Sequence, residues 1–110
     1  MIRDINPFIE DILQNIKDIE SFSKGLTKGK FLKNKLKQNA IIRSLEIIGE
    51  AVKNIPDSFR AAHPKVPWRR IAGFRDILSH AYFGVSMERV WNIIENDLLD
   101  LKKEIEKVKN

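Results

Sequence analysis

Residues 40–52 read AIIRSLEIIGEAV, and this stretch decides the fold. Its apolar residues recur at steps of three and four, as on an α-helix, but they cover more than one side of it. A helix of this kind either lies at the centre of a bundle or shares a face with a partner chain. The surrounding pattern extends the same predicted helix over about residues 28–54.

The rest of the chain repeats the helical pattern on both sides of this segment. Apolar residues at helical spacing predict long helices over about residues 4–23, 67–82 and 86–108. Pro56-Asp57 begins a predicted short turn or helix that runs through Ala62. No strand pattern or repeat is visible. The sequence therefore predicts an all-α, up-and-down helical bundle with four main helices and one short additional helix, in a single domain spanning residues 1–110.

The predicted helix ends coincide with residues that favour caps, turns and breaks. Such residues are Gly25 and Gly84 as helix stops, Thr27 and Ser86 as N-caps, and Pro67 in a first helical turn.

Composition limits the class of protein. The chain has 110 residues, 43% of them hydrophobic and 32% charged, which is typical of a globular protein. It has no cysteine, so disulfides and thiolate metal sites are excluded. No apolar run approaches the roughly 20 residues of a membrane span, and no signal-peptide pattern is visible. We expect a cytoplasmic protein with no membrane partner.

The net charge of +5 is unevenly distributed along the chain. Residues 24–75 carry thirteen basic and three acidic side chains, a local charge of +10. Six lysines fall within residues 24–37, where there is no acid. Such a run is either a solvated face or an electrostatic footprint for a polyanion such as RNA.

The segment from Arg75 to Tyr82 carries the candidate chemistry. At about 100° per residue, its apolar residues fall on one side of a helix and its polar residues on the other. The polar side presents a guanidinium, a carboxylate, a hydroxyl and an imidazole from Arg75, Asp76, Ser79 and His80, with Tyr82 at the edge. Most polar arcs are only solvated helix faces, and His80 alone could be a surface residue near a helix C-terminus.

Several kinds of active site fit this chain poorly. His63 and His80 are the only histidines, and their spacing matches no zinc motif, so we predict no metal and no cofactor. Ser79 and His80 are adjacent on a helix and point about 100° apart, which disfavours a Ser-His-Asp triad. The glycines near the lysine run lack the spacing of a phosphate-binding loop.

Metal-free cleavage of RNA fits better, because RNA carries its own nucleophile, the 2′-hydroxyl. Histidine transfers protons near neutral pH, and arginine matches phosphate oxygens as their charge rises. Asp76 could orient His80, while Ser79 and Tyr82 could contact phosphate or a base. A single histidine is a poor acid–base pair, so a two-fold dimer that joins two motif helices would supply the second one.

In these features the chain resembles the HepT-like branch of the HEPN superfamily, the ribonuclease toxins of bacterial and archaeal toxin–antitoxin pairs. Arg75, His80 and Tyr82 match the Arg-x4-His-x-Tyr signature of that family. The similarity runs from about residue 4 to 103. Flanking landmarks are Ile47-Ile48-Gly49-Glu50-Ala51, Val66-Pro67-Trp68, Tyr82-Phe83 and Val90-Trp91.

The resemblance implies a homodimer whose paired motifs form an RNA-cleaving groove without metal, with Arg75 and His80 catalytic. It further implies a type VII-like system, in which a minimal nucleotidyltransferase antitoxin neutralises the toxin by transferring AMP to Tyr82. Asp76 departs from the family, which often has asparagine there. A non-catalytic helical subunit that binds the nucleotidyltransferase is therefore the alternative. We expect Trp68 and Trp91 to be core or interface anchors and Gly49 to allow close helix packing.

Overall fold

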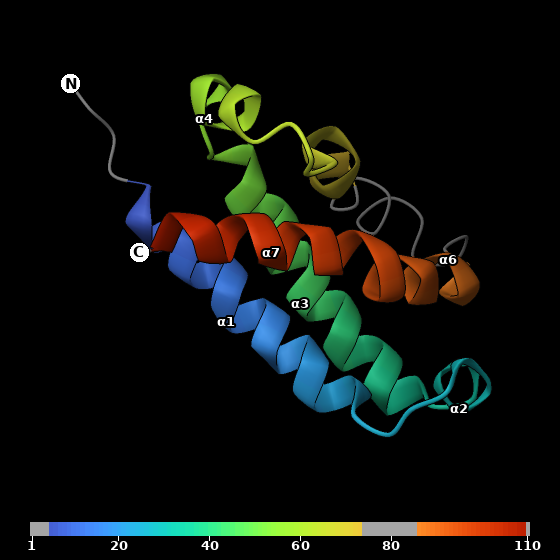
Figure 1. Ribbon diagram of the computed structural model, residues 1–110. Helices are drawn as coiled ribbons and strands as arrows, with labels where there is room; N and C mark the ends of the chain where they lie inside the picture. The colour runs from blue at the N-terminus through green and yellow to red at the C-terminus, as the bar shows by residue number, and fades with distance from the viewer. Residues whose placement is uncertain (1–4, 74–85, 110) are drawn as a thin grey trace.

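The computed structural model describes residues 5–73 and 86–109. Every regular element in these ranges is helical (Figure 1). In chain order they are α1 (Asn6–Ser23), α2 (Lys28–Leu32), α3 (Lys35–Lys53), α4 (Asp57–Ala62), a helix at residues 68–73, α6 (Met87–Asn92), the π-helical turn η1 (Ile93–Asp97) and α7 (Leu98–Lys109). The predicted all-α fold is confirmed.

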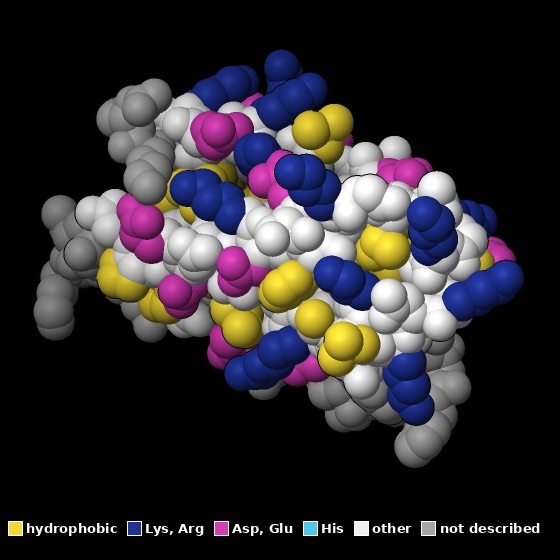
Figure 2. All heavy atoms as spheres, turned by 90° about the horizontal axis from the view of Figure 1, so that it is seen from below, with side chains coloured by type: hydrophobic (Ala, Val, Ile, Leu, Met, Phe, Trp, Pro, Cys, Tyr) yellow, Lys and Arg dark blue, Asp and Glu magenta, His cyan; other side chains and the backbone are white. Residues whose placement is uncertain are grey.

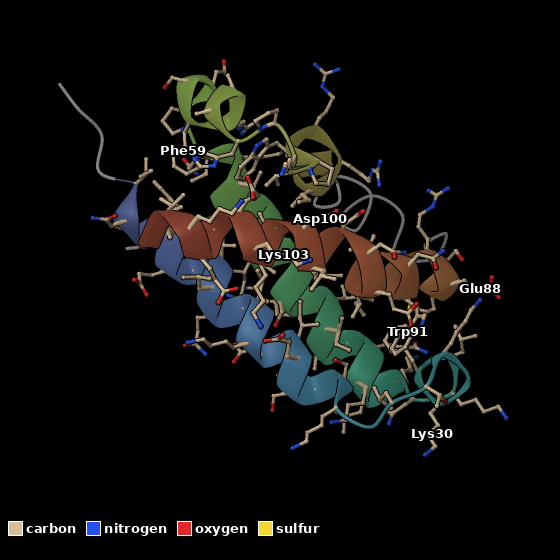
Figure 3. All side chains as sticks on the ribbon, in the orientation of Figure 1. Lys30, Phe59, Glu88, Trp91, Asp100 and Lys103 are labelled. Carbon is tan, nitrogen blue, oxygen red and sulfur yellow. The ribbon has the colours of Figure 1, made fainter. Side chains whose placement is uncertain are left out.

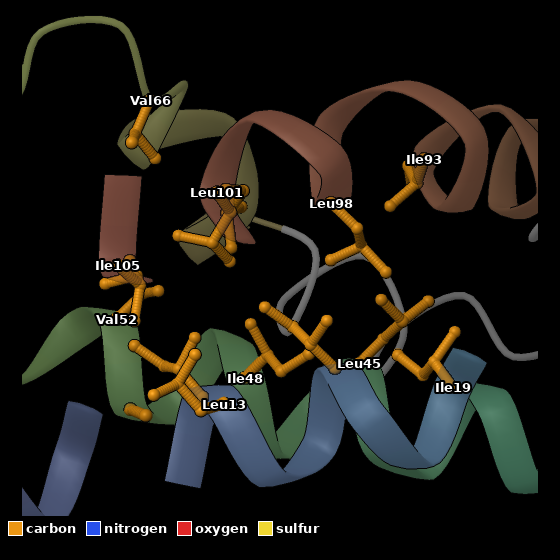
Figure 4. Close-up of a cluster of buried hydrophobic side chains, with 14 of the residues drawn as sticks. Leu13, Ile19, Leu45, Ile48, Val52, Val66, Ile93, Leu98, Leu101 and Ile105 are labelled. Carbon is orange, nitrogen blue, oxygen red and sulfur yellow. The ribbon is translucent and has the colours of Figure 1, made fainter. Parts of the chain in front are cut away.

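The bundle is built on the antiparallel pair α1 and α3, which lie side by side in Figure 1. α6, η1 and α7 form one continuous rod that crosses this pair. The apolar side chains between the two layers form the core, as Figure 4 shows. Its fully buried members include Ile12 and Ile19 of α1, Ile41, Leu45 and Ile48 of α3, and Leu101 and Ile105 of α7.

The position of α3 settles the question raised by its two apolar sides. Ile41, Ile42, Leu45 and Ile48 are all buried within the chain itself. α3 is therefore the central helix of the bundle. Its pattern is explained without a partner chain and gives no separate support for a dimer.

The predicted single helix over residues 28–54 was wrong, because it is two helices. Asn34 adopts an extended conformation, and its side-chain oxygen accepts a 3.0 Å hydrogen bond from the Lys37 amide, which starts α3. The Gln38 side chain donates to the Phe31 carbonyl at 2.9 Å and so closes the end of α2. This interruption between α2 and α3 lets α2 turn toward α6. There the centroid of the buried Phe31 ring lies 5.3 Å from that of the Trp91 ring.

Other predicted helix ends are confirmed where they are described. Gly25 has a φ of +76°, a conformation that glycine adopts without strain at a helix stop. Thr27 accepts a hydrogen bond from the Lys30 amide at 3.2 Å, and Ser86 accepts one from the Arg89 amide at 3.4 Å. Pro67 lies one residue before the helix at 68–73, and its carbonyl accepts the Ile71 amide. Gly84 lies outside the described residues.

Candidate functional site

The five predicted site residues all lie outside the described residues. They are Arg75, Asp76, Ser79, His80 and Tyr82. The structure does describe both segments that hold this stretch, namely the helix at residues 68–73 before it and α6 after it. The site is therefore built from these two flanks and from the side chains gathered beside them.

The helix at residues 68–73, which precedes the motif in the chain, is anchored in the core by its first residues. Trp68 and Ile71 are buried, and Val66 just before them is buried too. The Trp68 indole donates a 2.9 Å hydrogen bond to the His63 carbonyl, and its ring packs edge-on against Phe59 at 6.1 Å. Trp68 is thus a core anchor, as predicted. It fixes the position from which the chain runs into the motif.

An ion pair connects the same helix to η1. Nη1 of Arg70 lies 3.0 Å from Oδ1 of Asp97, the last residue of η1. The Asp97 side chain is only 11% exposed, whereas that of Arg70 is 65% exposed. A carboxylate this well covered by protein needs a charged hydrogen-bond partner, and Arg70 provides it. The pair therefore fixes the helix at residues 68–73 against η1.

The second flank is held from the other side by α2. Trp91 of α6 is buried against Phe31 of α2, which confirms Trp91 as a core anchor. Nζ of Lys28 lies 3.9 Å from Oε2 of Glu88 in the first turn of α6. Figure 3 shows Glu88 and Trp91 on α6, at the end of the molecule where α2 carries Lys30. The fold thus places the lysine-rich segment beside the helix that follows the motif.

His63, the second histidine, belongs to a different cluster. Its ring stacks on Phe59 at 4.6 Å, and its Nδ1 lies 3.7 Å from Oε1 of the buried Glu104 on α7. Nζ of Lys107 donates to the other oxygen of Glu104 at 2.7 Å, and this hydrogen bond lowers the pKa of Glu104. This cluster joins the connection after α4 to α7, which is a structural role.

Comparison with known protein families identifies the family of this chain. The family model described as "Ribonuclease HepT-like" matches residues 12–108, which is nearly the whole chain. The chain belongs to the HepT-like ribonuclease family. The resemblance inferred from the motif and its landmarks is confirmed.

Relatives of this HepT-like chain are similar over almost their full length. A protein of Thermococcus cleftensis named a probable ribonuclease HepT is 45% identical over 109 residues, 99% of each chain. A provisionally named RNase of Methanocaldococcus jannaschii is 48% identical over 106 residues, 96% of this chain and 88% of the relative. Another such RNase, from Caldanaerobacter subterraneus subsp. tengcongensis, is 44% identical over 102 residues, 93% of this chain and 91% of the relative. No solved structure matches the chain.

The described ranges contain neither a membrane-spanning helix nor a cluster of metal-ligating side chains. None of the helices in residues 5–73 and 86–109 is long and apolar enough to cross a bilayer. In the same ranges, no three His, Cys, Asp or Glu side chains gather as a metal site would require.

The structural role of two acidic residues, Asp97 and Glu104, was not identified from the sequence, and their side chains pair with residues on other segments. Asp97 lies on η1 and Glu104 on α7, each among apolar residues that face the core. An acidic residue in an otherwise apolar helix face is the sequence signal that could have identified them. Their partners Arg70 and His63 are 27 and 41 residues away in sequence, so the pairing itself needed the tertiary structure.

We expect Asp97→Asn to lower the free energy of unfolding by about 1 kcal/mol, because an amide cannot replace the charge-assisted bond to Arg70. Urea unfolding of both proteins measures this difference. The matched control is Asp100→Asn, since Asp100 is exposed on α7, and its stability should stay unchanged. A double-mutant cycle with Arg70→Ala isolates the pair, and a coupling energy near zero would contradict its proposed role.

Proposed function

We propose that this chain is a metal-independent endoribonuclease toxin that cleaves RNA at a cleft formed by two copies of itself. The observation that carries the proposal is the Arg75-x4-His80-x-Tyr82 motif within a chain of the HepT-like ribonuclease family. RNA cleavage would take place in the cytoplasm, where a toxin meets cellular RNA.

The chemistry needs only side chains that the motif contains. The ribose 2′-oxygen forms a bond to the adjacent phosphorus while a base takes its proton. The bond from phosphorus to the 5′-oxygen of the next nucleotide then breaks, and an acid protonates that leaving oxygen. His80 suits both proton transfers, because imidazole titrates near neutral pH.

The remaining motif residues support this reaction. Arg75 offers a planar, permanently charged fork to the phosphate oxygens, whose charge increases as phosphorus becomes five-coordinate. Asp76 would orient the His80 ring, and Ser79 would contact phosphate. Two copies of the motif in one cleft would supply one imidazole as the base and the other as the acid.

The segments that flank the motif support the proposal in two respects. Each segment that flanks the motif contains a buried tryptophan, Trp68 before it and Trp91 after it, so both flanks are anchored in the core. Catalysis depends on such fixed geometry. The lysines of α2 also lie beside α6, which gives a polyanion a basic approach to this side of the molecule.

We further propose that the chain is the toxin of a type VII-like toxin–antitoxin pair. Its antitoxin would be a minimal nucleotidyltransferase that transfers AMP from ATP to Tyr82. The Tyr82 oxygen would lose its proton and bond to the α-phosphorus, while the α–β phosphoanhydride bond breaks and pyrophosphate leaves. The phosphate of AMP would bring negative charge and bulk into a cleft that binds phosphate, and RNA would be excluded.

Cleavage in the absence of free metal ions tests the enzymatic proposal. We expect purified protein to cut RNA equally fast in buffer with EDTA and in buffer with Mg²⁺, because no step needs a Lewis acid. Gel separation of an end-labelled RNA measures the rate. If the protein cuts no RNA but co-purifies with the nucleotidyltransferase, the non-catalytic binding subunit becomes the better description. Asp76, at a position where the family often has asparagine, is the residue that favours this alternative.

A further inference from the structure

The α2 corner of the molecule carries a basic surface made of Lys28, Lys30, Lys33 and Lys35, which we call the α2 lysine surface. All four side chains are exposed. In Figure 2 many Lys and Arg side chains lie at the right-hand end of the face in view, the end where α2 and α6 lie in Figure 1. In Figure 3 the labelled Lys30 lies at the outer side of α2.

This surface has almost no acid to neutralise it. The sequence contains no Asp or Glu from residue 21 to residue 45. Among the described residues, the fold brings one carboxylate into an ion pair with it, that of Glu88, which lies 3.9 Å from Lys28. Within the part of the chain that the structure describes, Lys30, Lys33 and Lys35 make no ion pair. The positive potential of three lysines therefore remains available to a ligand.

The backbone beneath these lysines is held in place. Phe31 lies in the middle of the surface in sequence, yet it is fully buried against Trp91. Side-chain caps from Thr27 and Asn34 fix both ends of the segment. The spacing of the charges is thus set by the fold.

The surface also lies close to the proposed cleavage site along the chain. α2 packs on α6 through Phe31 and Trp91, and α6 begins directly after Ser86. Tyr82 precedes Ser86 by only four residues, and four residues of extended chain span at most about 14 Å. The α2 lysine surface therefore lies next to the helix that directly follows the motif in the chain.

We propose that the α2 lysine surface binds the sugar–phosphate backbone of the RNA substrate. This inference rests on the proposed function, because it takes RNA as the substrate. The contacts are ionic and independent of base sequence, since lysine ammonium groups meet phosphates as point charges. The surface would raise the affinity for longer RNA and would leave the chemical step to the motif.

The test measures binding to a single-stranded 2′-O-methyl RNA of about 20 nucleotides, which keeps every phosphate but has no free 2′-hydroxyl. The test variant is Lys30→Gln/Lys33→Gln/Lys35→Gln. The control variant is Lys17→Gln/Lys53→Gln/Lys103→Gln, which removes the same charge from α1, α3 and α7 at exposed positions. Fluorescence anisotropy at several salt concentrations gives the association constant for each protein.

Each phosphate contact on a single strand contributes about 0.7 to the slope of log association constant against log salt concentration. We expect the slope of the test variant to fall in magnitude by about 2, and that of the control to stay near the native value. The variant Lys30→Arg/Lys33→Arg/Lys35→Arg should keep the native slope, because it keeps the charge. Thermal unfolding checks that all variants are folded.

Equal slopes for the native protein and the test variant would overturn the inference, as would equal losses in the test and control variants. Loss of binding to polyglutamate with RNA binding intact would instead assign the surface to an acidic protein and also overturn it. Failure of the proposed function appears elsewhere, as absent cleavage of ordinary RNA, because the binding measurement requires no cleavage.

Discussion

We expect the replacement of His80 with alanine to lower the rate of RNA cleavage by about 10²–10⁴-fold, the range for removal of a general acid–base group. We expect Arg75→Ala to lower the rate at least 10²-fold, because the developing charge on phosphate would lose its proposed main partner. Arg75→Lys recovers only part of this loss, since an ammonium cannot engage two phosphate oxygens as a guanidinium does. Initial rates on an end-labelled RNA measure all three variants.

The matched control is His63→Ala, which removes the other histidine of the chain. Among the described residues, His63 faces Phe59 and Glu104. We expect cleavage by this variant near the native rate, with some loss of thermal stability. Native rates in both His80→Ala and Arg75→Ala would rule out the proposed catalytic roles.

We expect Tyr82→Phe to abolish the proposed transfer of AMP from ATP by a partner nucleotidyltransferase, because the hydroxyl that would attack the α-phosphorus is missing. Tyr82 is the only tyrosine of the chain, so a mass gain on any tyrosine identifies the site without ambiguity. Intact-mass spectrometry after incubation with the partner and ATP measures the transfer. The native protein should gain AMP and lose RNA cleavage in parallel.

The phenylalanine variant also separates modification from catalysis. It keeps the aromatic ring, so we expect RNA cleavage to continue in the presence of the partner and ATP, at a rate that no longer falls with time. Persistence of the AMP label in Tyr82→Phe would show that another residue is modified. In that case the proposed role of Tyr82 would have to be abandoned.

Local signals in the sequence predicted most of the helices correctly. Gly25, Thr27 and Ser86 act on the backbone within three residues of themselves, so their effects can be seen without knowledge of the fold. The predicted helix over residues 28–54 was wrong because helical periodicity continues through Lys33 and Asn34 and hid a local signal, the Asn34 cap that starts α3. What could not be read locally is the packing of Phe31 of α2 against Trp91, sixty residues away.

The features of the candidate site also separate into those visible in the sequence and those visible only in the tertiary structure. The sequence alone determined the family motif, because Arg75, His80 and Tyr82 have a spacing that can be recognised without a fold, and their proposed roles still await the kinetic tests. Only the tertiary structure paired Arg70 with Asp97 and brought the α2 lysine surface beside α6. Such contacts join residues far apart in the chain, and no short-range pattern specifies which distant side chain will satisfy a buried charge or cover a buried ring.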